Sequence, residues 1–379
     1  MNRNQMRLLF SILLVLSCSV DAIEHTDVFT SGAGGYHTYR IPAAIVSAKG
    51  TVLAFCEGRK KSRSDTGDID LVLRRSTDQG KTWGEPRVVW DDGGNTCGNP
   101  CPVLDRDTGT LWLLLTWNAG EIHESKVKPG FGLDSRRVFV THSTDDGLTW
   151  AEPSDITTVA KNKAWSWYAT GPGAGIQLQH GAHKGRLVIP CDHKMPLAAG
   201  GLKWGSHVIY SDDHGAHWKL GGVAEKGLVN ECEVVELSDG RLMLNMRNYD
   251  KTMKARQICF SKDGGASWQE QRLDPTLIEP ICQASIRRIS WPTSEAAGVI
   301  LFSNPASTKG RENMTVRASM DDGKTWPIQK GLHAGSAAYS CLCIFDARTF
   351  GCLYECDGYK HIRFAPLTLE SLSSASRTP

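Results

Sequence analysis

The chain alternates short runs of apolar, β-forming residues with turns that contain Gly, Asp or Asn. Short apolar runs bounded by turn residues predict β-strands. One pattern recurs along the chain: an apolar run, a turn glycine, and a second apolar run such as TVLAFCE or TLWLLLTW. The turn glycines are Gly50, Gly109, Gly185, Gly240, Gly298 and Gly351. The pattern therefore predicts a series of antiparallel hairpins in an all-β protein.

A second hairpin follows most of the first ones and carries the motif Ser-x-Asp-x-Gly-x-x-Trp, which we call the Asp box. The copies are Ser76–Trp83, Ser143–Trp150, Ser211–Trp218, Ser261–Trp268 and Ser319–Trp326. The Asp side chain can accept hydrogen bonds from the backbone ahead of it, Gly tolerates a positive φ, and Trp anchors the returning strand. We interpret the boxes as structural turns. A calcium site is the alternative, but the fixed positions of the box supply a single carboxylate.

The two kinds of hairpin together predict the architecture. Six first hairpins, five of them followed by a box hairpin, make about six four-stranded units. Regular repetition of this kind predicts a six-bladed β-propeller of four-stranded antiparallel blades. The last blade would be completed by a strand near residues 361–366 and by the N-terminal segment. A β-sandwich is the competing all-β fold, but it does not explain regularly spaced turns of one type.

The N-terminal segment predicts export. Arg3 and Arg7 precede the apolar run Leu8–Leu16, and small residues follow up to Ala22. This order is typical of a cleaved signal peptide at residues 1–22, which leaves a mature domain at 23–379. The apolar run is too short to span a membrane, so no stable membrane insertion is expected. We expect a secreted or periplasmic protein; a lipid anchor at Cys18 is the less favoured alternative.

Charge and cysteine content narrow the class of protein further. The net charge of +2 gives no reason to expect a nucleic-acid partner, and we expect a monomer. In an exported protein some cysteines are candidates for disulfides and others for buried thiols. The candidate pairs are Cys97 with Cys101, Cys341 with Cys343, and Cys352 with Cys356. None of the spacings is typical of a zinc site, and no metal or other cofactor is expected.

Polar residues gather at one predicted edge of the units. An antiparallel hairpin returns the end of its second strand to the edge where its first strand starts, and the boxes fall at the opposite edge. The residues at the first edge are Arg40, Asn99, Glu231 and Tyr339 at strand starts, and Arg59, Asp65, Arg247 and Arg311 after strand ends. Converging guanidinium groups predict binding of a carboxylate, and the acids with the tyrosine add acid–base and nucleophilic chemistry.

The segments that carry these residues are TYRIP, SDTGDID, NECEVVEL, NMRN and AAYS. Together with the Asp boxes, and in this order, they resemble the exo-α-sialidases, or neuraminidases, of the bacterial and animal glycosidase type. The resemblance extends from about Tyr39 to the end of the last unit. It implies a six-bladed propeller and a glycoside hydrolase that removes terminal α-linked sialic acid from glycoproteins, gangliosides or oligosaccharides.

The resemblance also implies a role for each residue at that edge. Arg40, Arg247 and Arg311 would clamp the sialic acid carboxylate, and Arg59 would contact ring substituents. Tyr339 would be the nucleophile with Glu231 as its partner. Asp65 would be the acid/base residue, with Asp68 as the alternative. The reaction would proceed with retention at the anomeric carbon, the exception to the two-carboxylate scheme of most glycosidases.

Other charged and aromatic residues have plainer interpretations. Surface ion pairs are expected for Arg256, Arg287, Arg288 and Arg317, a packing role for Tyr354, and solvent exposure for Glu233 and Glu236. The long loops at 118–137, 155–175 and 192–205 carry Trp165, Trp167, Tyr168, His193 and Trp204, which would contact sugar or pack within the loops. Two alternative functions remain open: a sialic-acid-binding propeller without catalysis, and a trans-sialidase.

Overall fold

The computed structural model of this protein describes residues 23–373. The predicted signal peptide at 1–22 lies outside the described residues. The strands are β1 (Thr26–Thr30), β2 (Thr38–Val46), β3 (Val52–Arg59), β4 (Ile69–Ser76), β5 (Arg87–Trp90), β6 (Thr96–Leu104), β7 (Leu111–Asn118), β8 (Arg137–Ser143), β9 (Ser154–Asp155), β10 (Tyr168–Thr170), β11 (Ile176–Gln177), β12 (Leu187–Pro196), β13 (Leu202–Ser211), β14 (Lys219–Val223), β15 (Val229–Glu236), β16 (Leu242–Asn248), β17 (Ala255–Ser261), β18 (Gln269–Ile278), β19 (Ser285–Ser290), β20 (Val299–Pro305), β21 (Glu312–Ser319), β22 (Ile328–Ile344), β23 (Thr349–Cys356) and β24 (His361–Thr368). The helical segments are short: η1 (Glu124–Lys126), α1 (Thr157–Ala160), η2 (Asp357–Tyr359) and α2 (Leu369–Ser373). Within residues 23–373 no helix has the length and apolar character needed to cross a membrane.

Strands that follow one another along the chain pair antiparallel, so the predicted all-β, antiparallel architecture is confirmed. The pairing runs from β2 to β5, from β6 to β9, from β12 to β14, from β15 to β18 and from β19 to β24. Two short strands, β10 and β11, pair with β12. A parallel bridge between Ile69 and Thr96 joins β4 to β6.

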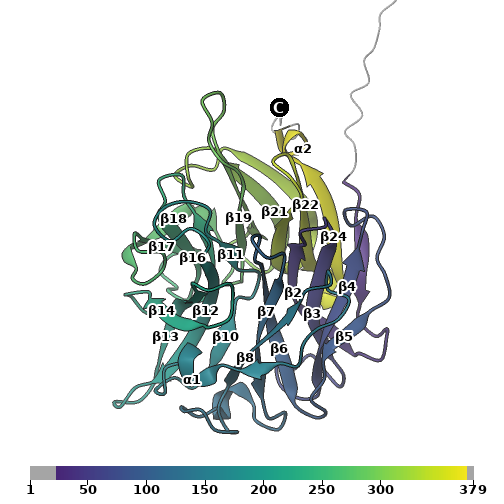
Figure 1. The fold of residues 1–379 in the computed structure, drawn as a ribbon, viewed down its shortest axis with the longest axis vertical. Coiled ribbons are helices and arrows are strands. Elements are labelled where there is room, and N and C mark those ends of the chain that lie inside the picture. The colour runs from purple at the N-terminus through teal and green to yellow at the C-terminus, as the bar shows by residue number, and fades with distance from the viewer. Residues whose placement is uncertain (1–22, 374–379) are drawn as a thin grey trace, which may run out of the picture.

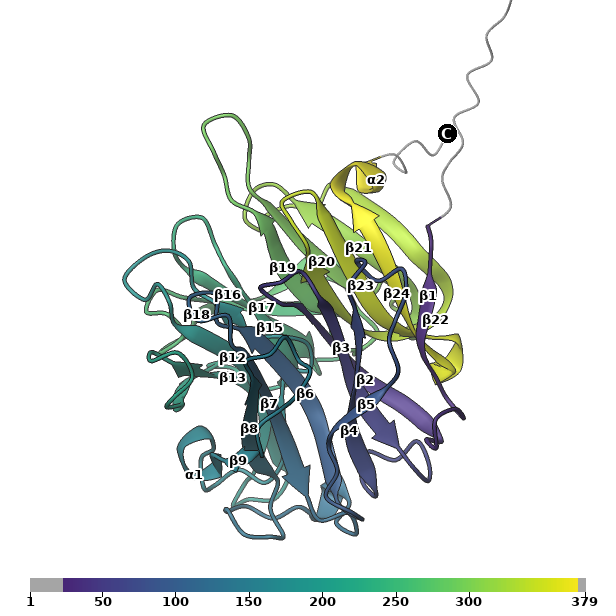
Figure 2. The same ribbon diagram turned by 45° about the vertical axis from the view of Figure 1, so that its right-hand side comes forward.

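The first and last strands of the described chain lie side by side. β1 pairs antiparallel with β24, with Thr26 opposite Phe364 and Thr30 opposite His361. In Figure 2 the purple β1 accordingly runs beside the yellow C-terminal strands. The N-terminal segment therefore completes the last sheet, as the sequence predicts.

Each Asp box closes its turn with its own side chains. In the first box Ser76 Oγ donates to Asp78 Oδ1 at 2.7 Å and accepts from the Gly80 N–H at 2.8 Å. The other carboxylate oxygen of Asp78 accepts from Thr82 Oγ1 at 2.6 Å. The same Ser–Asp bond recurs in the other four boxes. Because the hydrogen bonds of the turn occupy both oxygens, the structure supports the structural interpretation of the boxes.

The box glycine packs the turn against a neighbouring sheet. Gly80 has a φ of +87°, and a Cβ there would lie 2.1 Å from the ring of Phe364. At Gly215, with φ of +89°, a Cβ would lie 2.2 Å from the ring of Trp112. Only glycine combines this backbone conformation with so close an approach. The glycine of the motif is therefore required by packing between sheets as well as by the turn.

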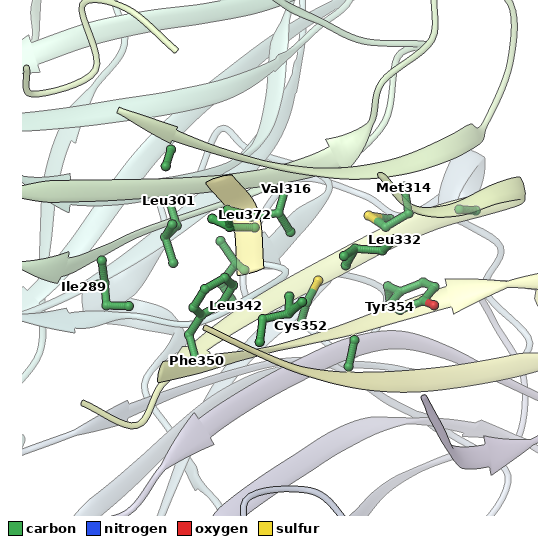
Figure 3. Close-up of a cluster of buried hydrophobic side chains, with 14 of the residues drawn as sticks. Ile289, Leu301, Met314, Val316, Leu332, Leu342, Phe350, Cys352, Tyr354 and Leu372 are labelled. Atoms are coloured by element: carbon green, nitrogen blue, oxygen red, sulfur yellow. The ribbon is translucent and has the colours of Figure 1, made fainter. Parts of the chain in front are cut away.

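Hydrophobic clusters fill the space between successive sheets. One cluster packs Leu301 and Val316, from β20 and β21, against Leu342 and Phe350, from β22 and β23. Figure 3 shows these side chains together with Met314, Cys352 and Tyr354. Tyr354 is fully buried in this cluster, which confirms its expected packing role.

The cysteines contribute to this core as thiols. The described residues contain eleven cysteines, all of them buried and free. The candidate disulfides Cys97–Cys101, Cys341–Cys343 and Cys352–Cys356 are therefore not formed. Both members of each pair face apolar surroundings in the clusters, where a thiol behaves as a small hydrophobic group.

Several charges expected at the surface are buried. Glu233 is 1% exposed and accepts from Ser285 Oγ at 2.9 Å, the Ile286 N–H at 2.8 Å and the Ala174 N–H at 3.1 Å. The surface prediction for Glu233 and Glu236 was wrong because alternation along a strand implies a solvent face only where that face is open to water. Here β15 is covered on both faces, and its carboxylates bridge backbone groups of other sheets. The same correction applies to the buried arginines Arg256, Arg287 and Arg317.

Candidate active site

One pocket, with a volume of about 570 Å³, collects all the residues that the sequence places at the functional edge. Its lining includes Arg40, Arg59, Asp65, Asn99, Glu231, Arg247, Arg311 and Tyr339. No residue of an Asp box lines it, as expected for turns at the opposite edge. The predicted convergence of these side chains is therefore what the structure shows.

Backbone bulges lie at three of these residues, Asn99, Glu231 and Tyr339, and directly after a fourth, Arg40. The antiparallel register shifts between Arg40 and Ala43 in β2 and between Gly98 and Cys101 in β6. It shifts again around Glu231 in β15 and around Tyr339 in β22. A bulge rotates one residue out of the regular alternation and re-aims its side chain. The bulges therefore help several strands present a polar side chain to the same pocket.

Tyr339 and Glu231 form the centre of the site. The phenol donates to Glu231 Oε1 at 2.5 Å, and Arg247 Nη1 donates to Glu231 Oε2 at 2.6 Å and to the phenol oxygen at 3.1 Å. Burial and the Glu231 carboxylate raise the pKa of Tyr339 well above its ordinary value. The phenol is therefore neutral at rest, and Glu231 is placed to take its proton.

Two further guanidinium groups flank the tyrosine ring. The Arg40 guanidinium lies 5.5 Å from the centre of the Tyr339 ring, and that of Arg311 lies 5.6 Å from it. Arg311 Nη1 also donates to Tyr359 Oη at 3.1 Å. With Arg247, three cations from three different strand pairs surround one phenol. This arrangement gathers three guanidinium groups around a neutral phenol, and among the described residues Arg311 is the one of the three without a carboxylate partner.

Two buried carboxylates that the sequence reasoning missed hold this arrangement. Glu355 in β23 is fully buried and accepts from Arg40 Nε at 2.6 Å, the Ile41 N–H at 2.9 Å and the Tyr339 N–H at 3.2 Å. Glu57 in β3 accepts from Arg59 Nη2 at 2.6 Å. A single acidic residue inside an otherwise apolar strand was the signal available in the sequence for both.

Asp65 lies at the mouth of the pocket. Its carboxylate pairs with Arg59 Nη2 at 2.7 Å, and its side chain is 58% exposed. Partial burial would raise the pKa of Asp65, but the Arg59 and Arg40 guanidinium groups outweigh it and lower the pKa below its ordinary value. Asp68 instead pairs with Lys60 at 2.9 Å and does not line the pocket. The geometry thus favours Asp65 over Asp68.

The loop aromatics divide into two sets. Trp167 and Trp204 line the pocket, the latter with Lys194 Nζ 3.9 Å above its ring. Trp165 instead stacks on His193 with ring centres 3.6 Å apart, and Tyr168 is fully buried. The sequence could not separate sugar-facing from packed aromatics because both kinds occupy the same loops. It also did not single out Arg136, Asp192, Lys194 and Tyr249, which line the pocket as well.

Two buried histidines, His193 and His207, pack against Trp165. Their burial predicts that the protein becomes less stable at acid pH. His193 Nδ1 and His207 Nδ1 lie 3.0 Å apart, and burial lowers the pKa of His193 from 6.5 to about 3 and that of His207 well below 6.5. Below pH 6.5 the unfolded chain binds protons that the folded protein does not. The free energy of unfolding should therefore fall as pH drops from 6.5 towards 4, by about 1.4 kcal/mol per pH unit for each histidine.

Urea unfolding between pH 4 and 7 measures this slope. His207→Gln should reduce it by about one proton, or about 1.4 kcal/mol per pH unit. His37→Gln, at an exposed side chain that hydrogen-bonds Thr38 and forms no ion pair among the described residues, is the control. Equal slopes in the parent and in His207→Gln would contradict the prediction.

Comparison with known proteins agrees with this geometry. Residues 50–352 match the family described as BNR repeat-like domain. The chain is 37% identical to the sialidase of Micromonospora viridifaciens over 349 residues, which cover 87% of this chain and 51% of that protein. It is 32% identical to the sialidase of Bacteroides fragilis over 379 residues, which cover 93% of this chain and 67% of that protein. The chain thus spans about half to two thirds of the length of these relatives.

A solved structure extends the likeness to the fold. The Hadza microbial sialidase Hz136 superposes with a TM-score of 0.83 at 32% identity, covering 92% of this chain and 69% of that chain. The pocket, the repeat family and the relatives agree: this chain belongs to the sialidase family of glycoside hydrolases.

Proposed function

We propose that this protein is an exo-α-sialidase that hydrolyses terminal α-ketosidically linked sialic acid from sialylated glycans, with retention. The observation that carries the proposal is the Tyr339–Glu231 pair, with its 2.5 Å hydrogen bond, inside a ring of three arginines. A protein that only binds sialic acid needs the arginines. It has no use for a buried phenol hydrogen-bonded to a carboxylate.

The charge of the substrate explains the choice of a tyrosine. Sialic acid carries a carboxylate on its anomeric carbon, which would repel an anionic nucleophile. Arg40, Arg247 and Arg311 would bind that carboxylate, since guanidinium forks match its geometry. The neutral Tyr339 phenol then attacks the anomeric carbon as Glu231 takes its proton.

The remaining steps fall to Asp65. It would protonate the departing glycosidic oxygen and then deprotonate the water that hydrolyses the sialyl-tyrosine. Two displacements at one carbon give net retention. Asp65 is an exposed carboxylate paired with Arg59. Bound substrate would desolvate it and so raise its pKa towards that of a useful acid.

Replacing Asp65 should have an effect that depends on the leaving group. Asp65→Ala should lower kcat/KM for a sialyl-oligosaccharide by about 10³-fold, because an alkoxide departs only with a proton. For a 4-methylumbelliferyl α-sialoside the loss should be about 10-fold or less, since a phenolate leaves unaided. Steady-state kinetics with both substrates measure the ratio. Asp68→Ala is the matched control, and equal losses on both substrates would contradict the assignment.

The stereochemistry of the first product tests the reaction as a whole. Proton NMR of a sialoside digest should show the α-anomer of free sialic acid before mutarotation forms the β-anomer. Early β-anomer would exclude retention. A transferred or internally cyclised sialic acid would indicate a trans-sialidase. A folded protein that binds sialic acid and releases none would be a binding propeller.

We also infer that the fold is the six-bladed propeller of the sequence prediction. The antiparallel pairings support six groups: β2–β5, β6–β9, β10–β14, β15–β18, β19–β22, and β22–β24 with β1. The hydrophobic clusters support a closed ring. Each joins one group to the next, and one packs Val28 and Phe364 of the last group against Ala54 of the first.

Export of the mature domain at 23–379 as a monomer remains part of the proposal. It is supported by the basic, apolar and small residues of the first 22 positions. N-terminal sequencing of protein recovered from the extracellular or periplasmic fraction should begin at Ile23. An uncleaved chain, or a lipid on Cys18, would contradict it.

A further inference from the structure

Two basic side chains are buried beside the pocket without a carboxylate partner among the described residues. Arg136, directly before β8, is 1% exposed and donates to the side-chain oxygens of Asn99 and Asn118. Lys161 is 3% exposed and donates to Ser135 Oγ at 2.6 Å, to the Arg136 carbonyl at 2.8 Å and to the Ser166 carbonyl. Neither forms an ion pair with any residue in 23–373. Burial and the neighbouring Arg136 lower the pKa of Lys161 to about 7, so the buried charge that calls for a functional reason is that of Arg136.

Arg136 fixes which way the Asn99 amide points. A guanidinium has only donors, so the amide atom that faces it must be the oxygen. Thr116 Oγ1 donates to the same Asn99 oxygen at 2.9 Å. The Asn99 Nδ2 group has no hydrogen-bond acceptor among the described residues, and Asn99 lines the pocket. The free amide donors therefore face the space that a substrate would occupy.

Arg136 also supports the adjoining aromatic wall. Its guanidinium lies 4.3 Å from the centre of the Trp167 ring, which lines the same pocket. Lys161 ties the Arg136 carbonyl to the Ser166 carbonyl, one residue before Trp167. A guanidinium at this distance attracts the face of an indole. One buried arginine thus holds both a polar and an aromatic element of the wall.

Asn99 is also linked, through hydrogen bonds, to Asp65, the proposed acid/base residue. The Asn99 N–H donates to Glu57 Oε1 at 2.9 Å, Glu57 Oε2 accepts from Arg59, and Arg59 pairs with Asp65. Asn99 has a φ of +53°, so its backbone is held in a conformation that needs such support. A charged donor on the Asn99 oxygen also polarises the amide and strengthens its remaining N–H donors.

We propose that Arg136 is a positioning residue of this sialidase: it orients the Asn99 amide so that Nδ2 donates to an acceptor oxygen on the bound sugar, and it holds Trp167 as the adjoining wall. The inference rests on the proposed function, because it assigns Arg136 a part in recognising that substrate. Arg136 itself does not touch the sugar. Its effect should appear in substrate binding rather than in the chemical step.

A double-mutant cycle on the 4-methylumbelliferyl α-sialoside tests this proposal. Arg136→Met should raise KM about 10-fold and leave kcat within about 2-fold, the size expected for one lost polarised hydrogen bond. Asn99→Gly, which suits the positive φ, should raise KM by a similar factor. The KM increase of the double variant should lie well below the product of the two single increases, since Arg136 acts largely through Asn99, and any excess over Asn99→Gly alone measures the Trp167 contact.

Arg317 offers a matched control. It is also a buried arginine whose Nη1 donates to an asparagine, Asn304 at 3.1 Å, but it lies outside the pocket. Arg317→Met should leave KM unchanged. Arg136→Lys, which keeps the charge and one donor, should restore KM to within about 3-fold of the parent value. If Arg136→Met does not fold, the cycle is run with Arg136→Gln, which also removes the charge.

Several results would overturn the inference. Multiplicative KM effects in the double variant would mean that Arg136 does not act through Asn99. A lower melting temperature with unchanged KM would mean a purely structural role. Parent protein that turns over no sialoside would contradict the proposed function instead. The same cycle is then measured as the Kd of free N-acetylneuraminic acid by calorimetry, and absent or uncoupled binding would overturn the inference as well.

Discussion

Tyr339→Phe is expected to lower kcat on a 4-methylumbelliferyl α-sialoside by on the order of 10³-fold or more. The substitution removes one oxygen, the atom that donates to Glu231 at 2.5 Å and accepts from Arg247 at 3.1 Å. The ring that packs between the Arg40 and Arg311 guanidinium groups is kept. KM should change much less than kcat, because the three arginines still bind the carboxylate.

Tyr354→Phe is the control for this substitution. Tyr354 is buried in the same sheet, but its hydroxyl contacts His25 at 3.2 Å, outside the pocket. The Tyr354→Phe variant should retain the kcat of the parent protein. The decisive second measurement is trapping: denatured protein from a turnover mixture should carry sialic acid on Tyr339 by mass spectrometry. Full activity in Tyr339→Phe would remove the tyrosine from the mechanism.

Arg311→Lys should lower kcat/KM by about 10²-fold, the value of a charge-assisted, two-point contact replaced by a single ammonium. Arg311 is the cleanest probe of the clamp because it has few protein partners. Arg40 is tied to Glu355, and Arg247 to both Glu231 and Tyr339. Arg311 donates to Tyr359 at 3.1 Å and to the Ile281 carbonyl at 3.4 Å. Its replacement should therefore change binding with little cost to folding.

The loss should depend on the substrate carboxylate. A sialoside methyl ester, which lacks that charge, should be a poor substrate for both proteins and should show a much smaller difference between them. Arg317→Lys, at a buried arginine outside the pocket, should match the parent on both substrates. An Arg311→Lys effect of equal size on acid and ester would mean that Arg311 does not bind the carboxylate.

The retaining mechanism links these two predictions. The arginines would bind an anion directly beside the atom that reacts, so the nucleophile must be neutral until it attacks. Burial and Glu231 keep the pKa of Tyr339 high, and Glu231 itself is hydrogen-bonded to Arg247. Arg247 therefore belongs both to the carboxylate clamp and to the hydrogen bonds that hold the nucleophile.

The sequence by itself determined the strands, their hairpin pairing and the structural nature of the Asp boxes. These features depend on local patterns, such as apolar runs, turn glycines and the Ser–Asp bond within a box. It also placed Arg40, Glu231, Arg247 and Tyr339 at one edge, because an antiparallel hairpin returns to the edge where it starts. Their placement at a common edge followed from the connectivity of the hairpins.

Only the tertiary structure decided how those side chains are held. The bulges directly after Arg40 and at Asn99, Glu231 and Tyr339 have no marker in the sequence, yet they change the direction of the side chains around them. The charges that alternation assigned to solvent, such as Glu233, are buried because neighbouring sheets cover both faces of their strands. Whether a charged side chain is buried or exposed depends on the segments that pack against it, and those segments lie far away along the chain. Glu355 on Arg40, and Arg136 on Asn99, become visible only when the sheets are brought together.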